Sequence, residues 1–175
     1  MLSITFRTLL VSACLGALSL LFSCQEFRPD ASALVEINGQ NIHLNKWEEA
    51  EVTRSGNLYL VSVKLRSNDN KWLFGGLGTI KADVELPYTF DLHSKESIWA
   101  LMLIYYPNPK SEIIRVTYGI SDTTTGSITL EQLNPAEGGY LLGSLNYSAA
   151  SKTDYSNGET TYDNTLKAKF YFGLK

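Results

Sequence analysis

The residues that could carry out chemistry in this sequence are few, and histidine is the scarcest of them. Catalytic triads need a nucleophile, a base and an orienting acid, and the chain has only two histidines, His43 and His93. The alternation of apolar residues puts His43 on the outward face of a hairpin and His93 at the end of a strand. Neither has the His-Glu-x-x-His spacing of a zinc site. We therefore predict that the protein is not an enzyme, holds no metal and needs no cofactor.

Carboxylates are the second group with catalytic potential. Glu48, Glu49 and Glu51 could supply the two carboxyl groups of a glycosidase. Such clusters occur on every solvated segment of an acidic protein, so we assign them to the surface. Asp69, flanked by two asparagines, offers oxygen ligands for calcium, but a calcium loop would need more acidic ligands and a distal glutamate. We interpret this stretch as a turn.

The first stretch of the chain has the composition of an export signal. A single cation, Arg7, precedes an apolar run that ends at Ser23 and is followed by Cys24. The run falls short of the roughly 18 to 20 apolar residues that a spanning helix needs. We predict that residues 1–23 are a signal peptide and that residues 24–31 form a tether.

The residues Leu21-Phe22-Ser23-Cys24 resemble a bacterial lipobox, in which a leucine, a variable residue and a small residue precede a cysteine that is lipidated and becomes the new N-terminus. The resemblance implies that Cys24 carries acyl chains such as palmitate. A second box ending at Cys14 fits the same letters, but only about five residues separate Arg7 from Ala13, fewer than the roughly 7 to 15 of an apolar signal segment. An uncleaved signal anchor is the third alternative.

Lipidation would fix the protein at a membrane surface. Each buried methylene contributes about 0.8 kcal/mol, so several acyl chains hold a protein effectively for good. Gln25, directly after the cysteine, is not the aspartate that the lipoprotein resemblance associates with inner-membrane retention. The resemblance therefore implies the outer membrane, with the domain on either its periplasmic or its outer side.

The body of the protein has the size of one domain. The 175-residue chain keeps 152 residues after removal of residues 1–23, and the loss of Arg7 leaves 14 basic against 18 acidic side chains, a net charge of −4. This balance gives no steering field for nucleic acid. Apart from Cys24 the body has no cysteine, so no disulfide can form within it, and core burial must hold the fold together.

Short apolar alternations separated by turn residues run through the body. Asn38-Gly39 lies between alternating segments of Ser32–Leu44 and predicts a hairpin, because both turn residues need positive φ. The clearest period of two is the last, over residues 166–174. About 8–10 short strands without a long helix predict an all-β fold for residues 32–175, a single-domain antiparallel β-sandwich or closed β-barrel.

Two segments leave the local structure open. Residues 45–48 have the spacing of a helix cap, so a single helical turn is an alternative to a strand there. Three glycines within residues 75–78 interrupt an aromatic strand, and they predict a bulge or a tight bend.

Three further segments carry specific expectations. Residues 98–106 are apolar on both faces, which indicates a central strand or one covered on both sides. Residues 112–120 are predicted to form a strand with Ile114 pointing inward. The polar stretch 151–164 is predicted to be a mobile loop.

The aromatic residues are the strongest candidates for a binding surface. The chain has ten tyrosines and three tryptophans, and strand parity points some of the rings away from the core. Exposed flat rings suit a protein or glycan partner. Core packing is the alternative, because aromatic residues are good strand formers. The candidate partner-binding residues are Trp72, Trp99, Tyr105, Tyr106 and Tyr140.

Four short patterns follow one another along the body of the chain. They are an early Val-Glu-Ile-Asn-Gly hairpin, Gly126–Leu130, Gly143–Ala149 and a closing aromatic strand. In this order the chain resembles a group of small uncharacterised Bacteroidetes-type outer-membrane lipoproteins, which implies an all-β lipoprotein and no catalytic residue. Asp122-Thr123-Thr124 resembles the O-glycosylation acceptor motif of Bacteroidetes-type secreted proteins, implying modification at Thr123, although it also makes a good turn.

These observations lead to one predicted function and one alternative. We predict a lipid-anchored lipoprotein of the cell envelope whose non-enzymatic β domain has a structural role or binds a protein or glycan partner. The alternative is a lipocalin-like carrier of an apolar ligand, but the Gly-x-Trp signature of that family is missing, since Asn45-Lys46 precedes Trp47. A large apolar cavity would favour the carrier, and a filled interior would count against it.

Overall fold

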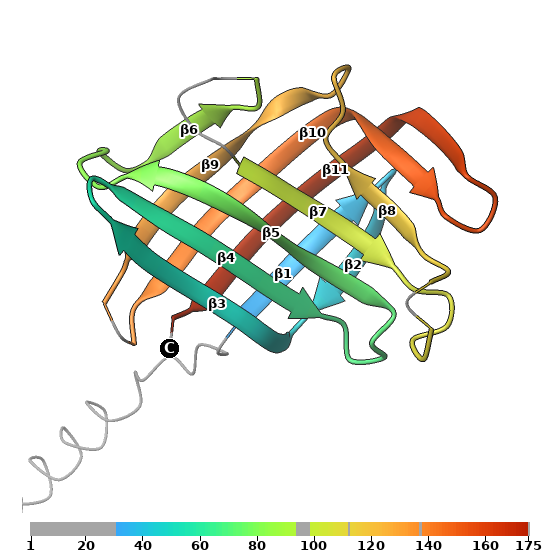
Figure 1. Ribbon diagram of the computed structural model, residues 1–175, viewed down its shortest axis with the longest axis horizontal. Helices are drawn as coiled ribbons and strands as arrows, with labels where there is room; N and C mark the ends of the chain where they lie inside the picture. The colour runs from blue at the N-terminus through green and yellow to red at the C-terminus, as the bar shows by residue number, and fades with distance from the viewer. Residues whose placement is uncertain (1–30, 94–98, 112, 137, 175) are drawn as a thin grey trace, which may run out of the picture.

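The protein folds into one strongly curled antiparallel β-sheet (Figure 1). The computed structural model describes residues 31–174 except 94–98, 112 and 137, so the predicted signal peptide and Cys24 lie outside the described residues. Within that part the sheet has eleven strands, and no residue is helical. The prediction of an all-β antiparallel fold is confirmed, with the sheet curled into a half-barrel.

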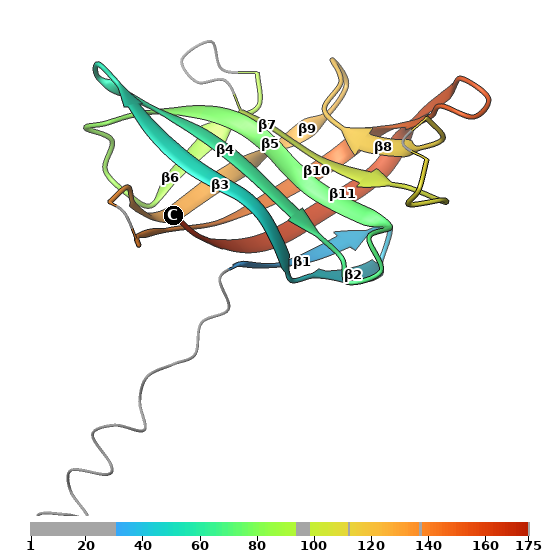
Figure 2. The same ribbon diagram turned by 60° about the horizontal axis from the view of Figure 1, so that its bottom comes forward.

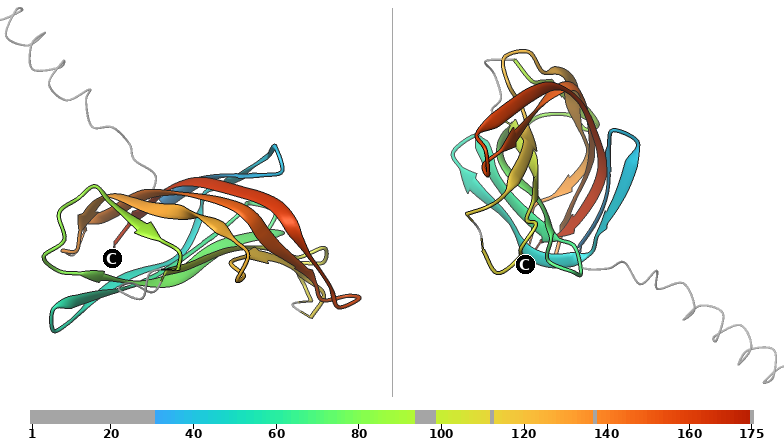
Figure 3. Two further views of the ribbon diagram at one scale, coloured as in Figure 1. Left: turned by 90° about the horizontal axis from the view of Figure 1, so that it is seen from above. Right: turned by 90° about the vertical axis from the view of Figure 1, so that its right-hand side faces the viewer.

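The sheet folds over on itself into two layers (Figures 1 and 3). The front layer contains β3 (Lys46–Ser55), β4 (Leu58–Arg66), β5 (Trp72–Lys81), β7 (Trp99–Tyr105) and β8 (Val116–Gly119). The rear layer contains β1 (Ala31–Ile37), β2 (Gln40–Leu44), β6 (Tyr88–Asp91), β9 (Thr125–Asn134), β10 (Tyr140–Asp154) and β11 (Glu159–Gly173). Each layer buries its inner face against the other.

Strand β10 joins the two layers because it changes partner along its length. Its first part, Tyr140–Ser148, pairs with β9, whereas Ser151–Asp154 pairs with β8 of the front layer. Between these parts Ala149 has φ 53°, and the register with β11 shifts. The buried Asn164 side chain donates a hydrogen bond to the Ala150 carbonyl at 3.2 Å, so a polar group lost from the ladder is satisfied at this irregularity.

Period-two alternation builds the core as predicted. On β11, Leu166 and Phe172 have no measurable exposure, and the intervening lysines face solvent. The Asn38-Gly39 hairpin is also confirmed, because the two residues have φ 47° and 82°. The local pattern therefore fixes which face of each strand turns inward.

Aromatic side chains fill the space between the layers. Phe74 of the front layer lies 5.9 Å from Phe170 of the rear layer, measured between ring centroids. Phe90 lies 5.2 Å from Trp99 in the same way. Both pairs join strands that are distant in sequence, so they hold the curled sheet closed by packing.

Residues 46–48, for which the sequence left a helical turn and a strand open, belong to β3. Two other local expectations were wrong. The glycines of β5 keep regular pairing with β4 and β7, without a bulge. They allow close approach instead, since a Cβ on Gly78 would lie 2.4 Å from the Trp99 ring. The stretch 151–164 forms paired strands up to a turn at residues 155–158, because side-chain oxygens of Asp154 and Asn157 accept hydrogen bonds from backbone N–H groups.

The two ends of the layered sheet carry different segments (Figure 2). At the near end, Ala31 pairs with Phe172, so the preceding chain enters the fold there. The far end carries the β4–β5 hairpin, the β7–β8 loop over residues 106–115, and the tip of the β10–β11 hairpin over residues 155–158. A tether that precedes Ala31 therefore meets the domain at the end opposite these three segments.

Candidate functional site

Two of the five candidate partner-binding rings are buried. Trp99 is 6 % exposed, and its indole N–H donates to the Thr79 carbonyl at 2.7 Å. Tyr106 is also 6 % exposed, with the Arg66 guanidinium 5.5 Å from its ring centroid. For these two residues the outward orientation is wrong, and the core-packing alternative holds.

Trp72 and Tyr105 form part of a half-buried aromatic cluster at the far end. Their ring centroids lie 4.6 Å apart, and Tyr118 lies 6.4 Å from Trp72. Burial raises the pKa of Tyr118, with smaller contributions from the Asp154 carboxylate and Tyr105. The sequence gave Trp72 and Tyr105 as candidate partner-binding rings but no sign that Tyr118 lies beside them. That proximity depends on the pairing of β7 with β8.

Beside this cluster lies an exposed apolar tip. Ile113 is 83 % exposed, Ile114 47 % and Tyr155 50 %. The Tyr155 N–H donates to the Arg115 carbonyl at 2.9 Å, and the Arg115 guanidinium lies 4.6 Å from the Tyr155 ring centroid. These contacts join two chain segments into one surface, which we call the far-end tip (Ile113, Ile114, Arg115 and Tyr155). The expectation that Ile114 points inward is wrong, because β8 begins only at Val116.

The remaining candidate ring, Tyr140, lies on the outer face of the rear layer. It stacks on Tyr171 with 6.0 Å between ring centroids. Tyr171 also lines an open hollow of about 410 Å³, together with Leu34, His43 and Lys169. His43 is exposed there, on the outward face of its hairpin as the sequence predicts.

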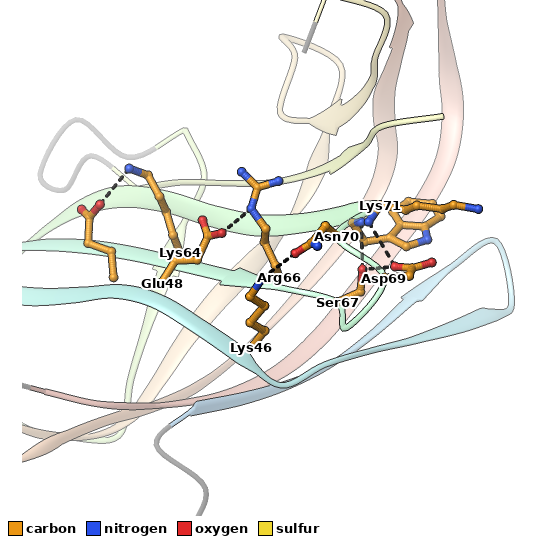
Figure 4. A network of polar contacts seen from close by, with 10 residues as sticks. Lys46, Glu48, Lys64, Arg66, Ser67, Asp69, Asn70 and Lys71 are labelled. Atoms are coloured by element: carbon orange, nitrogen blue, oxygen red, sulfur yellow. Dashed lines mark hydrogen bonds and ion pairs between the residues drawn. The ribbon is translucent and has the colours of Figure 1, made fainter. Parts of the chain in front are cut away.

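Two of the three glutamates of β3 form ion pairs with β4 (Figure 4). Glu48 pairs with Arg66, and Glu49 pairs with Lys64 at 2.7 Å. Hydrogen bonds from Lys64 and Ser62 lower the pKa of Glu49. These two carboxylates therefore connect an edge strand to its neighbour.

Asp69 occupies the turn between β4 and β5, as predicted (Figure 4). Its Oδ1 accepts a hydrogen bond from the Ser67 hydroxyl at 2.5 Å and another from the Lys71 N–H at 3.0 Å. The Ser67 bond is the main cause of a lowered Asp69 pKa. The Asp69 carboxylate therefore stabilises the β4–β5 turn through hydrogen bonds to residues of the same turn.

The second histidine contacts Thr124, the residue that follows the candidate glycosylation site Thr123. His93 Nε2 donates to the Thr124 carbonyl at 2.7 Å. Thr124 is fully buried, and its hydroxyl donates to the Ala149 carbonyl at 3.1 Å. Thr123 is exposed, so its hydroxyl is accessible and the residue stays a candidate for O-glycosylation.

Among the described residues, no group of three or more His, Cys, Asp or Glu side chains is arranged to hold a metal ion. The same part of the chain contains no helix long and apolar enough to cross a membrane. No protein-family model, curated protein or solved structure matches the chain.

Proposed function

We propose that the protein is a non-enzymatic binding protein of the cell envelope, anchored through lipid on Cys24 and contacting a protein partner with its far-end tip. The observation that carries this proposal is the exposure of Ile113 and Ile114 on a surface braced by Arg115 and Tyr155. Aliphatic side chains at such exposure gain most when a partner removes them from water.

The position of the tip supports its role. Six residues separate Cys24 from Ala31. The seven Cα-to-Cα steps between them span at most about 3.6 Å each, so the near end stays within about 25 Å of the anchor. The tip lies at the opposite end of the domain (Figure 1). A lipid-anchored molecule would thus present Ile113 away from the bilayer.

The chemistry of the tip favours a protein partner over a glycan. Isoleucine offers no hydrogen bonds to sugar hydroxyls, whereas apolar anchors next to aromatic and arginine side chains are common at protein interfaces. Three hollows lined by described residues open on the outer faces of the layers, and Phe74 packs against Phe170 between the layers. These features support binding at the outside over carriage of a ligand within the sheet.

The anchor is tested by replacing each cysteine in turn. In cells fed labelled palmitate, we expect Cys24→Ser to lose the label and to leave the membrane fraction. Cys14→Ser is the matched control and should keep both, because the thioether forms at Cys24. Label that survives in Cys24→Ser but disappears in Cys14→Ser would assign the lipid anchor to Cys14, the cysteine of the second box.

The tip is tested with a photoreactive phenylalanine derivative at Ile113 of the full chain in intact cells. We expect one protein adduct of defined mass. Ile114→Asp in the same chain should lower its yield about tenfold, because a charge at an apolar contact costs well over the 1.4 kcal/mol that tenfold represents.

The same photoreactive group at Asn57, an exposed turn residue at the near end, is the control. Equal adducts from Asn57, or a yield unchanged by Ile114→Asp, would contradict the proposal. An adduct that consists of glycan would assign the tip to the other partner class.

A further inference from the structure

The outer face of the front layer carries a second apolar surface, made of residues other than those of the far-end tip. It consists of outward-facing side chains of β4, β5 and β7, which we call the front apolar face: Leu60, Leu73, Leu77, Met102 and Ile104. Leu77 is 65 % exposed, Leu60 45 % and Met102 39 %. Monomeric proteins seldom leave such contiguous apolar side chains in water without a binding partner.

The shape of this face is a projection flanked by two hollows. Leu77 stands between an open hollow of about 440 Å³, lined also by Leu60 and Thr79, and one of about 270 Å³, lined also by Met102 and Ile104. Ser62 pairs with Leu77 across the strands and lines both hollows. A projecting leucine beside a hollow with room for a leucine can enter the same hollow of a second copy.

The sequence of β7 points to a covered outer face. Its run is apolar on both sides, a pattern typical of strands buried on both faces. The rear layer covers the inward residues Leu101 and Leu103, while no described residue covers Met102 on the outside. The rear layer differs, because Lys167 and Lys169 alternate along its outer face and keep it in water. The two outer faces therefore differ, because the front one carries leucine and methionine where β11 carries lysines.

Charges of both signs border the front apolar face. Glu48 and Glu49 pair with Arg66 and Lys64 of the neighbouring strand, and Glu51 lines the larger hollow. A rim with both signs exerts only a weak field on a strongly charged partner. It also lets two identical faces meet without like-charge repulsion, because acids and bases of one copy can lie opposite bases and acids of the other.

We propose that the front apolar face binds a second copy of this chain, with Leu77 of each copy entering the hollow beside Leu60 of the other. Such a reciprocal contact is the geometry of a two-fold interface, in which one patch serves both subunits. The face lies along the side of the layered sheet, so the far-end tip stays free in the dimer. The inference needs no lipid anchor and stands independently of the proposed function.

The proposal is tested by cross-linking the full chain in intact cells through single introduced cysteines. Ser62→Cys lies near the two-fold axis, and a short bismaleimide should join two copies. Leu34→Cys, on the outer face of the rear layer where Leu34 is 42 % exposed, is the matched control and should give only the background of the parent chain. Leu77→Asp added to Ser62→Cys should lower the dimer about tenfold or more, because it places a charge at the centre of the contact.

Two further variants keep the outcome interpretable. Leu77→Ala shortens the projection without adding charge, and it should also reduce the Ser62→Cys dimer. Leu34→Asp carries the same new charge on the other outer face and should leave that dimer unchanged. Equal cross-linking through Leu34→Cys, a product whose mass is not twice that of the chain, or a dimer insensitive to both Leu77 variants would overturn the proposal. A product containing a different protein would assign the face to that partner.

Discussion

Gly76→Ala is expected to lower the free energy of unfolding by about 3 kcal/mol or more, the upper range of overpacking effects. A Cβ at Gly76 would lie 1.8 Å from the backbone oxygen of Ala100 on β7. A side chain could rotate away, but a backbone carbonyl in the sheet ladder cannot, so β5 and β7 must separate. Urea unfolding of the purified protein, followed by tryptophan fluorescence, measures the change. Since domains are stable by about 5 to 15 kcal/mol, the variant is expected to be close to unfolding.

Gly119→Ala is the matched control for this prediction. Its Cβ would have Met102 Cβ as its nearest neighbour, at 3.8 Å, which is ordinary contact. Glycine within a strand costs conformational entropy, so alanine here should change stability by less than about 1 kcal/mol. Equal urea midpoints for the two variants would show that β7 does not approach β5 as closely as the structure has it.

The inner faces of the strands could be predicted from the sequence because they depend on local alternation alone. Leu166 and Phe172 of β11 are buried where the period of two puts them. The turn at Asn38-Gly39 was predictable for a similar reason, since its φ angles are a property of two adjacent residues.

Features that depend on contacts between distant segments could not be predicted. The change of partner along β10 requires the bulge at Ala149 and a hydrogen bond from Asn164, and no local pattern announces that pair. The outer half of the β10–β11 hairpin, residues 151–164, was mistaken for a loop. It is polar on both sides, so the alternation that identifies a strand is missing there.

The candidate site was predictable in part. Trp72 and Tyr105, two of the candidate partner-binding rings, are half-buried at the far end, where their binding role stays a prediction. Parity could not tell that Trp99 and Tyr106 turn into the packing. The far-end tip was missed because Ile113 and Ile114 continue an apolar pattern into β8. The signal available was the Pro107-Asn108-Pro109 stretch, which ends β7 and makes the following residues a loop.

Phe74→Ala is the second variant with a large expected effect, a loss of roughly 3 to 5 kcal/mol in the free energy of unfolding. Phe74 is fully buried, and its ring meets Phe170 across the layers at 5.9 Å. Truncation removes that contact and leaves a cavity which two hydrogen-bonded layers cannot close by moving together. Urea unfolding should show an earlier midpoint with an unchanged slope, because the surface exposed on unfolding stays nearly the same.

Two comparison variants separate loss of packing from other causes. Phe74→Leu keeps most of the apolar volume, so it should lose clearly less stability than Phe74→Ala. Leu34→Ala removes a comparable apolar group from an outer face, where Leu34 is 42 % exposed, and should change the free energy of unfolding by no more than about 0.5 kcal/mol. If Phe74→Ala cost no more than Leu34→Ala, the front and rear layers would not be held together by this aromatic contact, and the curled sheet would need another source of closure.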